Sequence, residues 1–580
     1  MQFMKHQNQR AAWFIFVFYH RLGKDLDYSF MRNFISTCLL TFVLLGNIGY
    51  AQQTVGLFQN SANAFEGYTL FAPLSSNTTF LINNCGQKVH EWQSSSNPGN
   101  SVYLLENGDL LHTGRIANST FNVGGFGGRI ELLDWNSTVL WSYDYSSNDH
   151  CQHHDVEYLP NGNILLIAWE KKTQAEAVAQ GRNPNLLSGD LWPDHILELL
   201  PMSPGSASVV WEWHAWDHLV QDFDSLKPNF GVVADHPERI NLNYANAGLG
   251  GYSDWMHTNS VSYNADLDQI ILSVHNFHEV WVIDHSTTSA EAASSTGGNS
   301  GKGGDLLYRW GNPIAYDRGT TGDKQFFGQH DAQWIPTGDR YAGQIMVYNN
   351  GIQRPGGNHS TIDIIDPPVD SLGNYSIVSN QTFAPALPTW TWRDNPQADF
   401  FSSGISGAQR LPGNHTLICE GVSGHLFELD SVGTVIWDYV SPIAAAGPVQ
   451  QGDPISGNSV FRCLRYAPDY AAFDNHTLTA GDRIELNPLP LPANCTTASI
   501  GTPLAKKTFN ISPNPFQSEF TLKQSGKVQS TLDLYNLQGQ LLSSFDIQAQ
   551  EQIIEIYHLA KGVYIAKLRG QSGYIKIVKH

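Results

Sequence analysis

The feature that most constrains this chain is a set of internal repeats. One phrase, a short strand followed by an Asn- or Gly-containing turn and an apolar strand, recurs at residues 102–111, 156–165 and 408–417. Asn-Gly pairs are typical of hairpin turns. A second phrase ends each unit on a tryptophan-bearing strand, at Trp92, Trp141, Trp211 and Trp213, Trp310, Trp392 and Trp437. Six such units of about four strands each predict an all-β fold, a six-bladed β-propeller.

The composition agrees with many short strands. Only 15% of the residues are charged, while the chain has 52 Gly, 16 Trp and 23 Tyr, a balance that favours strands and tight turns. The formal net charge of −20 argues against nucleic acid or an anionic membrane as a partner. An anionic ligand would therefore need histidines or arginines concentrated at one site.

The sequence changes character after Cys495. A proline-rich stretch at 488–492 indicates a linker, and residues 507–580 alternate apolar residues with Gly and Asn turns. This alternation predicts a small C-terminal antiparallel β-sandwich. We therefore expect three parts, namely an N-terminal extension and signal peptide (1–51), a propeller (52–498), and a linker with a C-terminal domain (499–580).

The N-terminal region contains the three parts of a secretory signal. A charged start at Met31 is followed by an apolar run over 34–49 and by the small residue Ala51. We expect cleavage near Ala51 and interpret Met31 as the true start; a signal anchor that begins at Met1 is the alternative. No later segment has the apolar length of a membrane helix, so we expect an exported protein without a stable membrane span.

Five cysteines remain once the predicted signal is removed: Cys85, Cys151, Cys419, Cys463 and Cys495. They show no CxxC or zinc-type spacing. One disulfide suits an oxidising compartment, and we expect it between Cys419 and Cys463, although spacing alone does not determine connectivity. The odd number leaves at least one free thiol.

Three histidines, His154, His257 and His330, fall at one position of three repeats, where the chain enters the first strand of a unit. In a propeller that strand lines the central channel, so we expect the three imidazoles to face one cavity. A single histidine there would orient its own blade, whereas three predict a shared functional site. Zinc bound by three histidines is the alternative, but the blades would hold those ligands apart around the channel. We expect no metal and no other cofactor.

Several phrases, taken in order, resemble the bacterial arylsulfotransferase family. They lie at residues 152–163, 254–263, 279–284, 328–333 and 461–466. The resemblance covers most of residues 65–490. It implies a six-bladed propeller that moves a sulfuryl group from an aryl sulfate donor to a phenolic acceptor, without a nucleotide donor.

The resemblance also implies roles for individual residues. His330 would be the nucleophile that becomes transiently sulfurylated, with His257 and His154 as the other catalytic groups. A neutral ring nitrogen can attack sulfur in line while neighbouring donors stabilise charge on the equatorial oxygens. The further substrate-binding positions would be His153, Asn259 and Tyr466.

One position departs from the family pattern. Where the family has an arginine after the second histidine, this chain has His275. A guanidinium is always charged and presents a planar fork, which an imidazole imitates only when it is protonated. We expect Arg354 to supply the missing charge, with Arg462 and Arg465 as further candidates; the alternative for Arg354 is a solvated loop residue.

The last seventy or so residues resemble the C-terminal sorting domain of proteins exported by the type IX secretion system, through phrases at 511–516, 534–540, 562–567 and 575–579. This resemblance implies the type IX machinery as a partner, transit through the periplasm, and a final place at the cell surface or outside the cell.

Three functions remain open at this point. We favour a sulfotransferase with a ping-pong mechanism. A sulfatase-like hydrolase would use the same site with water as the acceptor. A non-catalytic propeller would bind sulfated or phenolic ligands, and His275 would then record lost chemistry.

Overall fold

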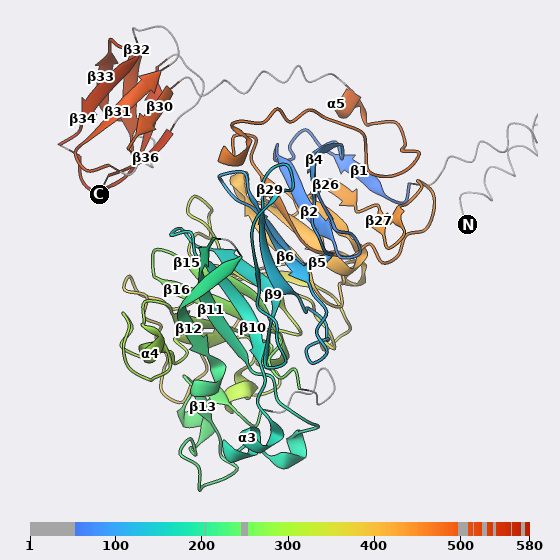
Figure 1. Cartoon of the computed structure of the whole chain (residues 1–580), viewed down its shortest axis with the longest axis vertical. Coiled ribbons are helices and arrows are strands. Elements are labelled where there is room, and N and C mark those ends of the chain that lie inside the picture. Colours follow the sequence, from blue (N-terminus) through green and yellow to red (C-terminus); the bar gives the residue numbers. More distant parts are fainter. Residues whose placement is uncertain are drawn as a thin grey trace, which may run out of the picture. The chain divides into compact units, whose positions relative to one another are not determined.

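The computed structural model describes residues 53–203, 205–244, 253–496, 509–513, 516–524, 530–536, 541–557, 559–569 and 575–579. The predicted signal peptide and residues 499–508, the start of the predicted C-terminal part, lie outside the described residues. The described chain is built of strands with only short helical turns, which confirms the all-β class (Figure 1).

Six antiparallel sheets of four or five strands form the described chain between Gly56 and Tyr466. The first contains β5 (Pro98–Leu104), β6 (Leu110–Arg115), β7 (Gly128–Leu133) and β8 (Val139–Asp144). The second contains β9 (His150–Tyr158), β10 (Ile164–Glu170), β11 (Asp194–Met202) and β12 (Ser206–His214). The third contains β15 (Thr258–Asn264), β16 (Gln269–Val274), β17 (Glu279–Asp284) and β18 (Tyr308–Trp310).

The remaining three sheets complete the set. The fourth contains β19 (His330–Trp334), β20 (Ile345–Asn349), β21 (Thr361–Ile365) and β22 (Trp390–Trp392). The fifth contains β23 (Gly407–Leu411), β24 (His415–Glu420), β25 (His425–Leu429), β26 (Val435–Val440) and β1 (Gly56–Asn60). The sixth contains β29 (Val460–Tyr466), β2 (Tyr68–Pro73), β3 (Thr78–Asn83) and β4 (Lys88–Gln93).

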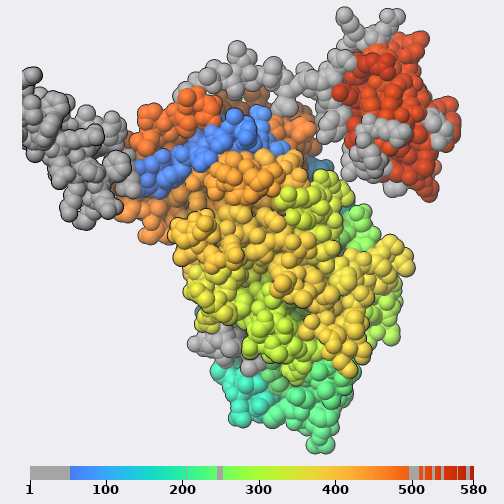
Figure 2. Space-filling model, turned by 180° about the vertical axis from the view of Figure 1, so that it is seen from behind, coloured from blue at the N-terminus to red at the C-terminus, as the bar shows by residue number. Residues whose placement is uncertain are grey.

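The N-terminal strands complete the last two sheets. β2 pairs with β29, and β1 pairs with β26, both antiparallel. Figure 2 shows the N-terminal segment, in blue, lying against later segments in orange. Strands that are about 400 residues apart in the sequence therefore share sheets.

The first strands of the six sheets contact one another in cyclic order: β5, β9, β15, β19, β23, β29 and β5 again. At three of these junctions a side chain accepts a hydrogen bond from a backbone N–H of the next strand. The pairs are Asp155 with Val261 (3.2 Å), Ser260 with Ala332 (2.9 Å) and Asp331 with Ala408 (2.9 Å). Hydrogen bonds thus join neighbouring sheets at their inner strands.

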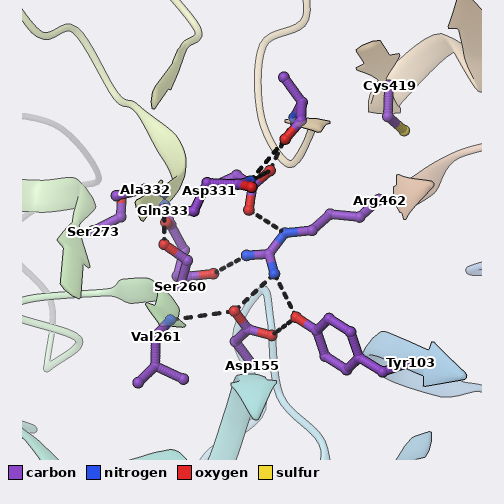
Figure 3. Close-up of polar contacts among 12 residues, drawn as sticks. Tyr103, Asp155, Ser260, Val261, Ser273, Asp331, Ala332, Gln333, Cys419 and Arg462 are labelled. Atoms are coloured by element: carbon purple, nitrogen blue, oxygen red, sulfur yellow. Dashed lines mark hydrogen bonds and ion pairs between the residues drawn. The ribbon is translucent and has the colours of Figure 1, made fainter. Parts of the chain in front are cut away.

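The guanidinium of Arg462, on β29, holds several of these strands together (Figure 3). It lies 2.8 Å from Asp155 and 3.0 Å from Asp331, and it also donates to the Tyr103 hydroxyl (2.8 Å) and the Asn259 carbonyl (3.3 Å). Burial disfavours this charge, but the two carboxylates outweigh burial and raise the pKa of Arg462. One buried cation therefore connects its own strand to strands of four other sheets.

The repeated tryptophans join the sheets at their outer strands. Each of the six sheets carries one in its last strand or, in the fifth, in β26. Five of them donate their indole N–H to a carbonyl of a neighbouring sheet: Trp141 to Ser206 (2.8 Å), Trp213 to Gly304 (2.7 Å), Trp310 to Pro385 (2.6 Å), Trp392 to Gly433 (3.1 Å) and Trp437 to Asn84 (2.8 Å). Truncation of a buried tryptophan to alanine typically costs about 3–5 kcal/mol. The repeat therefore marks the contacts between sheets.

Short elements connect the sheets. Two small sheets pair β13 (Leu219–Val220) with β14 (Ile240–Asn241) and β27 (Ile443–Ala444) with β28 (Gly447–Pro448). Within the described ranges the α-helices are α3 (Gln174–Ala179), α4 (Ser289–Ala292) and α5 (Ala493–Thr496). The 3-10 turns are η1 (Pro184–Leu186), η2 (Ala215–Asp217), η3 (Val233–Asp235), η4 (His275–Phe277), η5 (Pro313–Tyr316), η6 (Gln397–Asp399), η7 (Pro412–Asn414), η8 (Gly421–Ser423) and η9 (Ala471–Phe473). None of the helices in the described ranges has the length and apolar character needed to cross a membrane.

The described C-terminal residues form two antiparallel sheets. One contains β30 (Phe509–Ser512), β31 (Glu519–Gln524) and β34 (Glu551–Glu555). The other contains β32 (Ser530–Tyr535), β33 (Leu541–Ile547), β35 (Gly562–Leu568) and β36 (Ile575–Lys579). Their apolar side chains, among them Phe520, Leu532 and Ile577, belong to one buried cluster.

The disulfide joins Cys85 to Cys495, so the expected pair of Cys419 and Cys463 was wrong. Cys419, Cys463 and Cys151 are free and buried. Cys85 lies in the turn between β3 and β4, and Cys495 lies in α5. The two half-cystines are separated by 410 positions, and only the closure of the fold by its N-terminal strands brings them together.

We expect that replacing Cys85 and Cys495 together with serine lowers the free energy of unfolding by about 2–4 kcal/mol, because the unfolded chain loses a long-range cross-link. Urea denaturation with and without reductant measures this. Reductant should lower the stability of the wild type and leave the double variant unchanged. Equal stability of the two proteins under oxidising conditions would contradict the prediction.

His285 connects the second and third sheets. Its Nδ1 lies 2.7 Å from Asp268, in the turn between β15 and β16, and its Nε2 lies 2.9 Å from Glu198 of β11. Burial disfavours the charged ring, but the hydrogen bonds to the two carboxylates outweigh burial and raise the pKa of His285 to about 9. The folded protein therefore holds an imidazolium at neutral pH.

We expect His285→Gln to lower the free energy of unfolding by about 2 kcal/mol at pH 6, with a much smaller effect at pH 10. The pKa of His285 is about 9 in the folded protein and about 6.5 in the unfolded chain, so protonation stabilises the fold fully below about pH 6.5. This stabilisation is lost as the pH rises through about 9. Denaturation at both pH values provides the measurement, and a pH-independent difference would refute the linkage.

Candidate functional site

Four imidazoles follow one another in an arc at the inner strands. The ring centroid of His154 lies 4.5 Å from that of His257, His257 lies 5.3 Å from His275, and His275 lies 5.3 Å from His330. His154 is on β9, His257 directly precedes β15, His275 opens η4, and His330 opens β19. The structure thus brings together the three predicted catalytic histidines, with His275 between two of them.

The three histidines do not share one repeat position. The three acceptors at the inner-strand junctions occupy equivalent positions, and the residues directly before them are His154, Asn259 and His330. His257 lies two residues before Asn259. The inner strands are irregular here, because the pairing of β9, β15 and β19 with the strand that follows each of them is shifted at this place. Asn259 instead donates to the Gln329 carbonyl (2.8 Å), next to His330.

A close approach of the backbone positions His154. This residue has a left-handed backbone (φ 52°), and a Cβ on Gly125 would lie 1.9 Å from its ring. Gly125 itself has φ +88°, and its carbonyl accepts the N–H of His154 (2.8 Å). Only glycine allows both the conformation and the contact at position 125.

His330 is held in one tautomer. Its Nδ1 lies 2.8 Å from Oδ1 of Asn350. The amide of Asn350 donates to two backbone carbonyls, those of Ser402 and Ile405 (3.0 Å each), so its oxygen must face His330. Nδ1 of His330 therefore carries the proton, and Nε2 keeps its lone pair. Burial is the main cause that lowers the pKa of His330 well below its ordinary value, and the unfavourable interaction between two protonated rings at His275 and His330 adds to it.

His257 is paired with a carboxylate. Its Nδ1 lies 2.5 Å from Asp254, whose other oxygen accepts the indole N–H of Trp169 (2.9 Å). Burial opposes a charge on His257, but Asp254 outweighs burial and raises the pKa of His257. Asp254 has a lowered pKa because His257 more than offsets the effect of its burial. This pair supplies the arc with a cationic imidazole.

The other two imidazoles of the arc are neutral at physiological pH. Burial, followed by the charge on His257, lowers the pKa of His154 well below its ordinary value and that of His275 to about 4. Nδ1 of His154 lies 2.8 Å from Nδ1 of His153, and Nδ1 of His275 lies 2.8 Å from Oδ1 of Asn276. The predicted residue His153 thus contacts His154 with one ring nitrogen, while its Nε2 lies 3.3 Å from the buried carboxylate of Asp194 on β11.

Positive charges lie on the same segments as the arc. Nζ of Lys324 lies 4.9 Å from the ring centroid of Phe327, and the guanidinium of Arg354 lies 5.6 Å from the same ring. His278 lies beside the same segment, because its Nδ1 accepts the N–H of the residue after Phe327. Burial lowers the pKa of His278, and the positive charge of Lys324 lowers it further. Lys324 was not recognised in the sequence, where it is an isolated lysine.

Three predicted or candidate residues contact other parts of the fold. Arg354 donates to Thr361 (3.0 Å) rather than to an imidazole of the arc. The hydroxyl of Tyr466 accepts the N–H of Leu104 (2.9 Å). Arg465, in the sixth sheet, forms an ion pair with a carboxylate of β25 in the fifth sheet and donates to a hydroxyl of its own sheet. Their roles toward a substrate therefore stay predictions.

Two contact residues of the site were missed by sequence reasoning. Asp254 lies three positions before His257, inside a phrase that resembles the family. The sequence therefore showed where Asp254 lies, but not that its carboxylate contacts His257. Asn350 begins the loop after β20, twenty positions from His330, and has no sequence signal. Among the described residues, no three His, Cys, Asp or Glu side chains are arranged to hold a metal ion.

Fold and site together define an all-β protein with a group of buried histidines at its inner strands. The chain belongs to the Arylsulfotransferase (ASST) family, which matches residues 95–436, and membership supports sulfotransferase activity. Residues 510–580 match the secretion system C-terminal sorting domain, which supports export by the type IX system to the cell surface or exterior. Both resemblances predicted from the sequence are confirmed.

Similar solved structures are distant. A protein of unknown function from Bacteroides caccae is 11% identical, covers 69% of this chain and 98% of its own, and has a TM-score of 0.36. A putative 6-phosphogluconolactonase from Bacteroides fragilis is 11% identical, with coverage of 70% and 100% and a TM-score of 0.32. A streptogramin B lyase is 10% identical, with coverage of 72% and 96% and a TM-score of 0.31. No match was found among curated proteins.

We expect Asp254→Asn to lower the pKa of His257 below its ordinary value of about 6.5, because burial then acts on the imidazolium without an opposing charge. Histidine ring signals followed by NMR against pH measure this. His285, with a pKa of about 9, is the internal reference and should not move. An unchanged titration of His257 in the variant would show that Asp254 does not hold its charge.

Proposed function

We propose that this protein is a sulfotransferase that moves a sulfuryl group from an aryl sulfate to a phenolic acceptor through a sulfohistidine at His330. We further propose that residues 52–498 form a six-bladed β-propeller and that 499–580 contain a linker and a β-sandwich sorting domain. Export would then pass through the periplasm after cleavage of a signal peptide. The cyclic contacts of the six inner strands and the two matched families support this arrangement.

The observation that carries the proposal is the state of His330. Its Nδ1 is committed to Asn350, its pKa is lowered, and Nε2 is therefore a neutral nucleophile. Its neighbours provide the complementary group, since Asp254 holds a proton on His257 within the same arc. A nucleophile and an acid with separated pKa values are what an acid-assisted group transfer requires.

In the first half-reaction, Nε2 of His330 attacks the sulfur of the aryl sulfate in line. The N–S bond forms as the bond between sulfur and the aryl oxygen breaks, and the electron pair of that bond stays on the oxygen. The proton of His257 neutralises the leaving phenolate, whose ordinary pKa is about 10. A phenol leaves, and His330 holds the sulfuryl group.

In the second half-reaction, the neutral His257 takes the proton of the acceptor phenol. The acceptor oxygen attacks sulfur, the N–S bond breaks, and its electron pair returns to Nε2 of His330. His257 is again an imidazolium paired with Asp254. Atoms and protons balance over the cycle, and no cofactor takes part.

The other predicted positions assist the transfer. His154 and His275 flank His257 and are neutral in the free protein, so they gain a positive charge only when a bound sulfate ester raises their pKa values. This is the consequence of a histidine where the family has an arginine. Asn259 and His153 hold the segments around His330 and His154 through their contacts with Gln329 and His154.

We expect the wild-type protein to turn over 4-nitrophenyl sulfate continuously only when phenol is added. With the donor alone it should release one nitrophenol per chain and then carry one SO₃ group. His330→Ala should lose the label, seen by intact mass, and about a thousandfold or more of the turnover, because the nucleophile is gone. Release of nitrophenol and the protein mass are the two measurements.

His236→Ala is the matched control, because this histidine is partly exposed and its ring contacts Glu238 (3.0 Å). It should retain both label and turnover. Continued release without phenol, beyond one nitrophenol per chain, would favour the hydrolase. Binding without release would favour the non-catalytic reading, and undiminished turnover in His330→Ala would remove His330 from the role of nucleophile.

A further inference from the structure

Two cations surround one aromatic ring beside His330. Lys324 and Arg354 lie 4.9 Å and 5.6 Å from the ring centroid of Phe327. Lys324 and Phe327 belong to the segment that leads into His330, and Arg354 belongs to the loop that begins at Asn350, the hydrogen-bond partner of His330. The two segments also bond to each other, because the Phe327 carbonyl accepts the N–H of residue 352 (3.0 Å). The cations are therefore built into the two segments that hold the nucleophile.

Neither cation forms an ion pair with a carboxylate among the described residues, although the charge on Asp363 partly offsets the burial of Arg354. Arg354 instead contacts the ring of His359 (3.2 Å) and the hydroxyl of Thr361 (3.0 Å). Its Nε is buried without a hydrogen-bond partner. Both side chains are only partly exposed, and burial lowers the pKa of Lys324 to about 8 and also lowers that of Arg354.

Most other buried arginines among the described residues pair with a carboxylate, namely Arg309, Arg410, Arg462 and Arg465. Arg182 is an exception, because it donates to backbone carbonyls instead. Removing charge from water costs free energy unless a partner offsets it. Lys324 and Arg354, which form no ion pair, are therefore suited to binding an anion from outside the fold.

We propose that Lys324 and Arg354 bind a second anionic group of the substrate, so that the preferred donor is an aryl sulfate whose ring carries a further carboxylate or sulfate. The inference rests on the proposed function, because it assumes that the transferred sulfuryl group lies at His330. The second group would lie over Phe327, where both cations reach it. The positive pair also offsets the repulsion that a chain of net charge −20 exerts on a doubly charged donor.

The transferred sulfuryl group itself is a poorer occupant for these cations. His257 already supplies a positive charge within the arc, at 4.5 Å and 5.3 Å from its two neighbouring rings. Arg354 is anchored to Thr361, on the strand after its own loop, and Lys324 contacts Phe327. Neither cation forms a hydrogen bond with an imidazole of the arc among the described residues, although Lys324 is close enough to act on His275.

The test compares two donors that differ by one charge, 4-carboxyphenyl sulfate and its methyl ester, with phenol as the acceptor. We expect the wild type to prefer the carboxylate donor in kcat/KM by about tenfold or more, the size of one charge-assisted hydrogen bond. In Lys324→Gln and in Arg354→Gln the ratio of the two donors should fall toward one. Arg354→Lys, which keeps the charge, should retain most of the preference.

Lys302→Gln is the matched control, because Lys302 is an exposed loop lysine whose loss changes the net charge equally. It should leave the donor ratio unchanged. Circular dichroism and the thermal midpoint establish that each variant is folded, and Arg354→Lys keeps the test decisive if a glutamine variant unfolds.

Each outcome decides one question. No preference in the wild type, or a ratio that persists in the glutamine variants, would overturn the inference. An equal loss for both donors would mean that the cations bind the transferred sulfuryl group, which also overturns it. If neither donor turns over, the proposed function fails; calorimetric affinities of the two esters for wild type and variants then decide the anion subsite separately.

Discussion

The buried guanidinium of Arg462 is the interaction on which the centre of the structure depends. Its two carboxylate partners, Asp155 and Asp331, also accept backbone N–H groups of the next inner strands. The residues directly before these aspartates are His154 and His330. The ion pairs that close the inner ring therefore also set the positions of two imidazoles of the site. Removing one partner of a buried pair typically costs about 3–5 kcal/mol, so the charge at Arg462 is essential to the fold.

Charge separation within the arc is the second physical theme. His257 is cationic because the nearby carboxylate raises its pKa more than burial lowers it. The other three imidazoles are neutral because burial lowers their pKa values and no carboxylate outweighs that effect, namely those of His154, His275 and His330. An anion that reaches the arc changes this balance, since a negative charge favours protonation of the neutral rings. Binding of a sulfate ester and uptake of protons are thus coupled in a way that a permanently charged arginine would not require.

The contacts between neighbouring sheets could be predicted from the sequence, because the same residue type makes them in each repeat. The tryptophans recur since each fills the same kind of contact between neighbouring sheets, and their spacing predicted the all-β class. The site was readable only in part. His154, His257 and His330 were found, but the irregular pairing of the inner strands concealed that His257 lies two residues before the position that matches the other two.

Contacts between segments that are distant along the chain could not be predicted. Asn350 and Lys324 meet the arc through the folding of one sheet and its loops, which leaves no spacing pattern. The disulfide was missed for the same reason, because Cys85 and Cys495 approach each other only through the pairing of the N-terminal strands with the last ones.

That pairing has a consequence for how the protein is made. β1 to β4 are synthesised early, yet their partners β26 and β29 emerge from the ribosome almost 400 residues later. The early strands must therefore wait with unpaired edges, and pairing at such a separation is slow. The ring of inner strands can close only when nearly all of the residues up to Tyr466 have been synthesised.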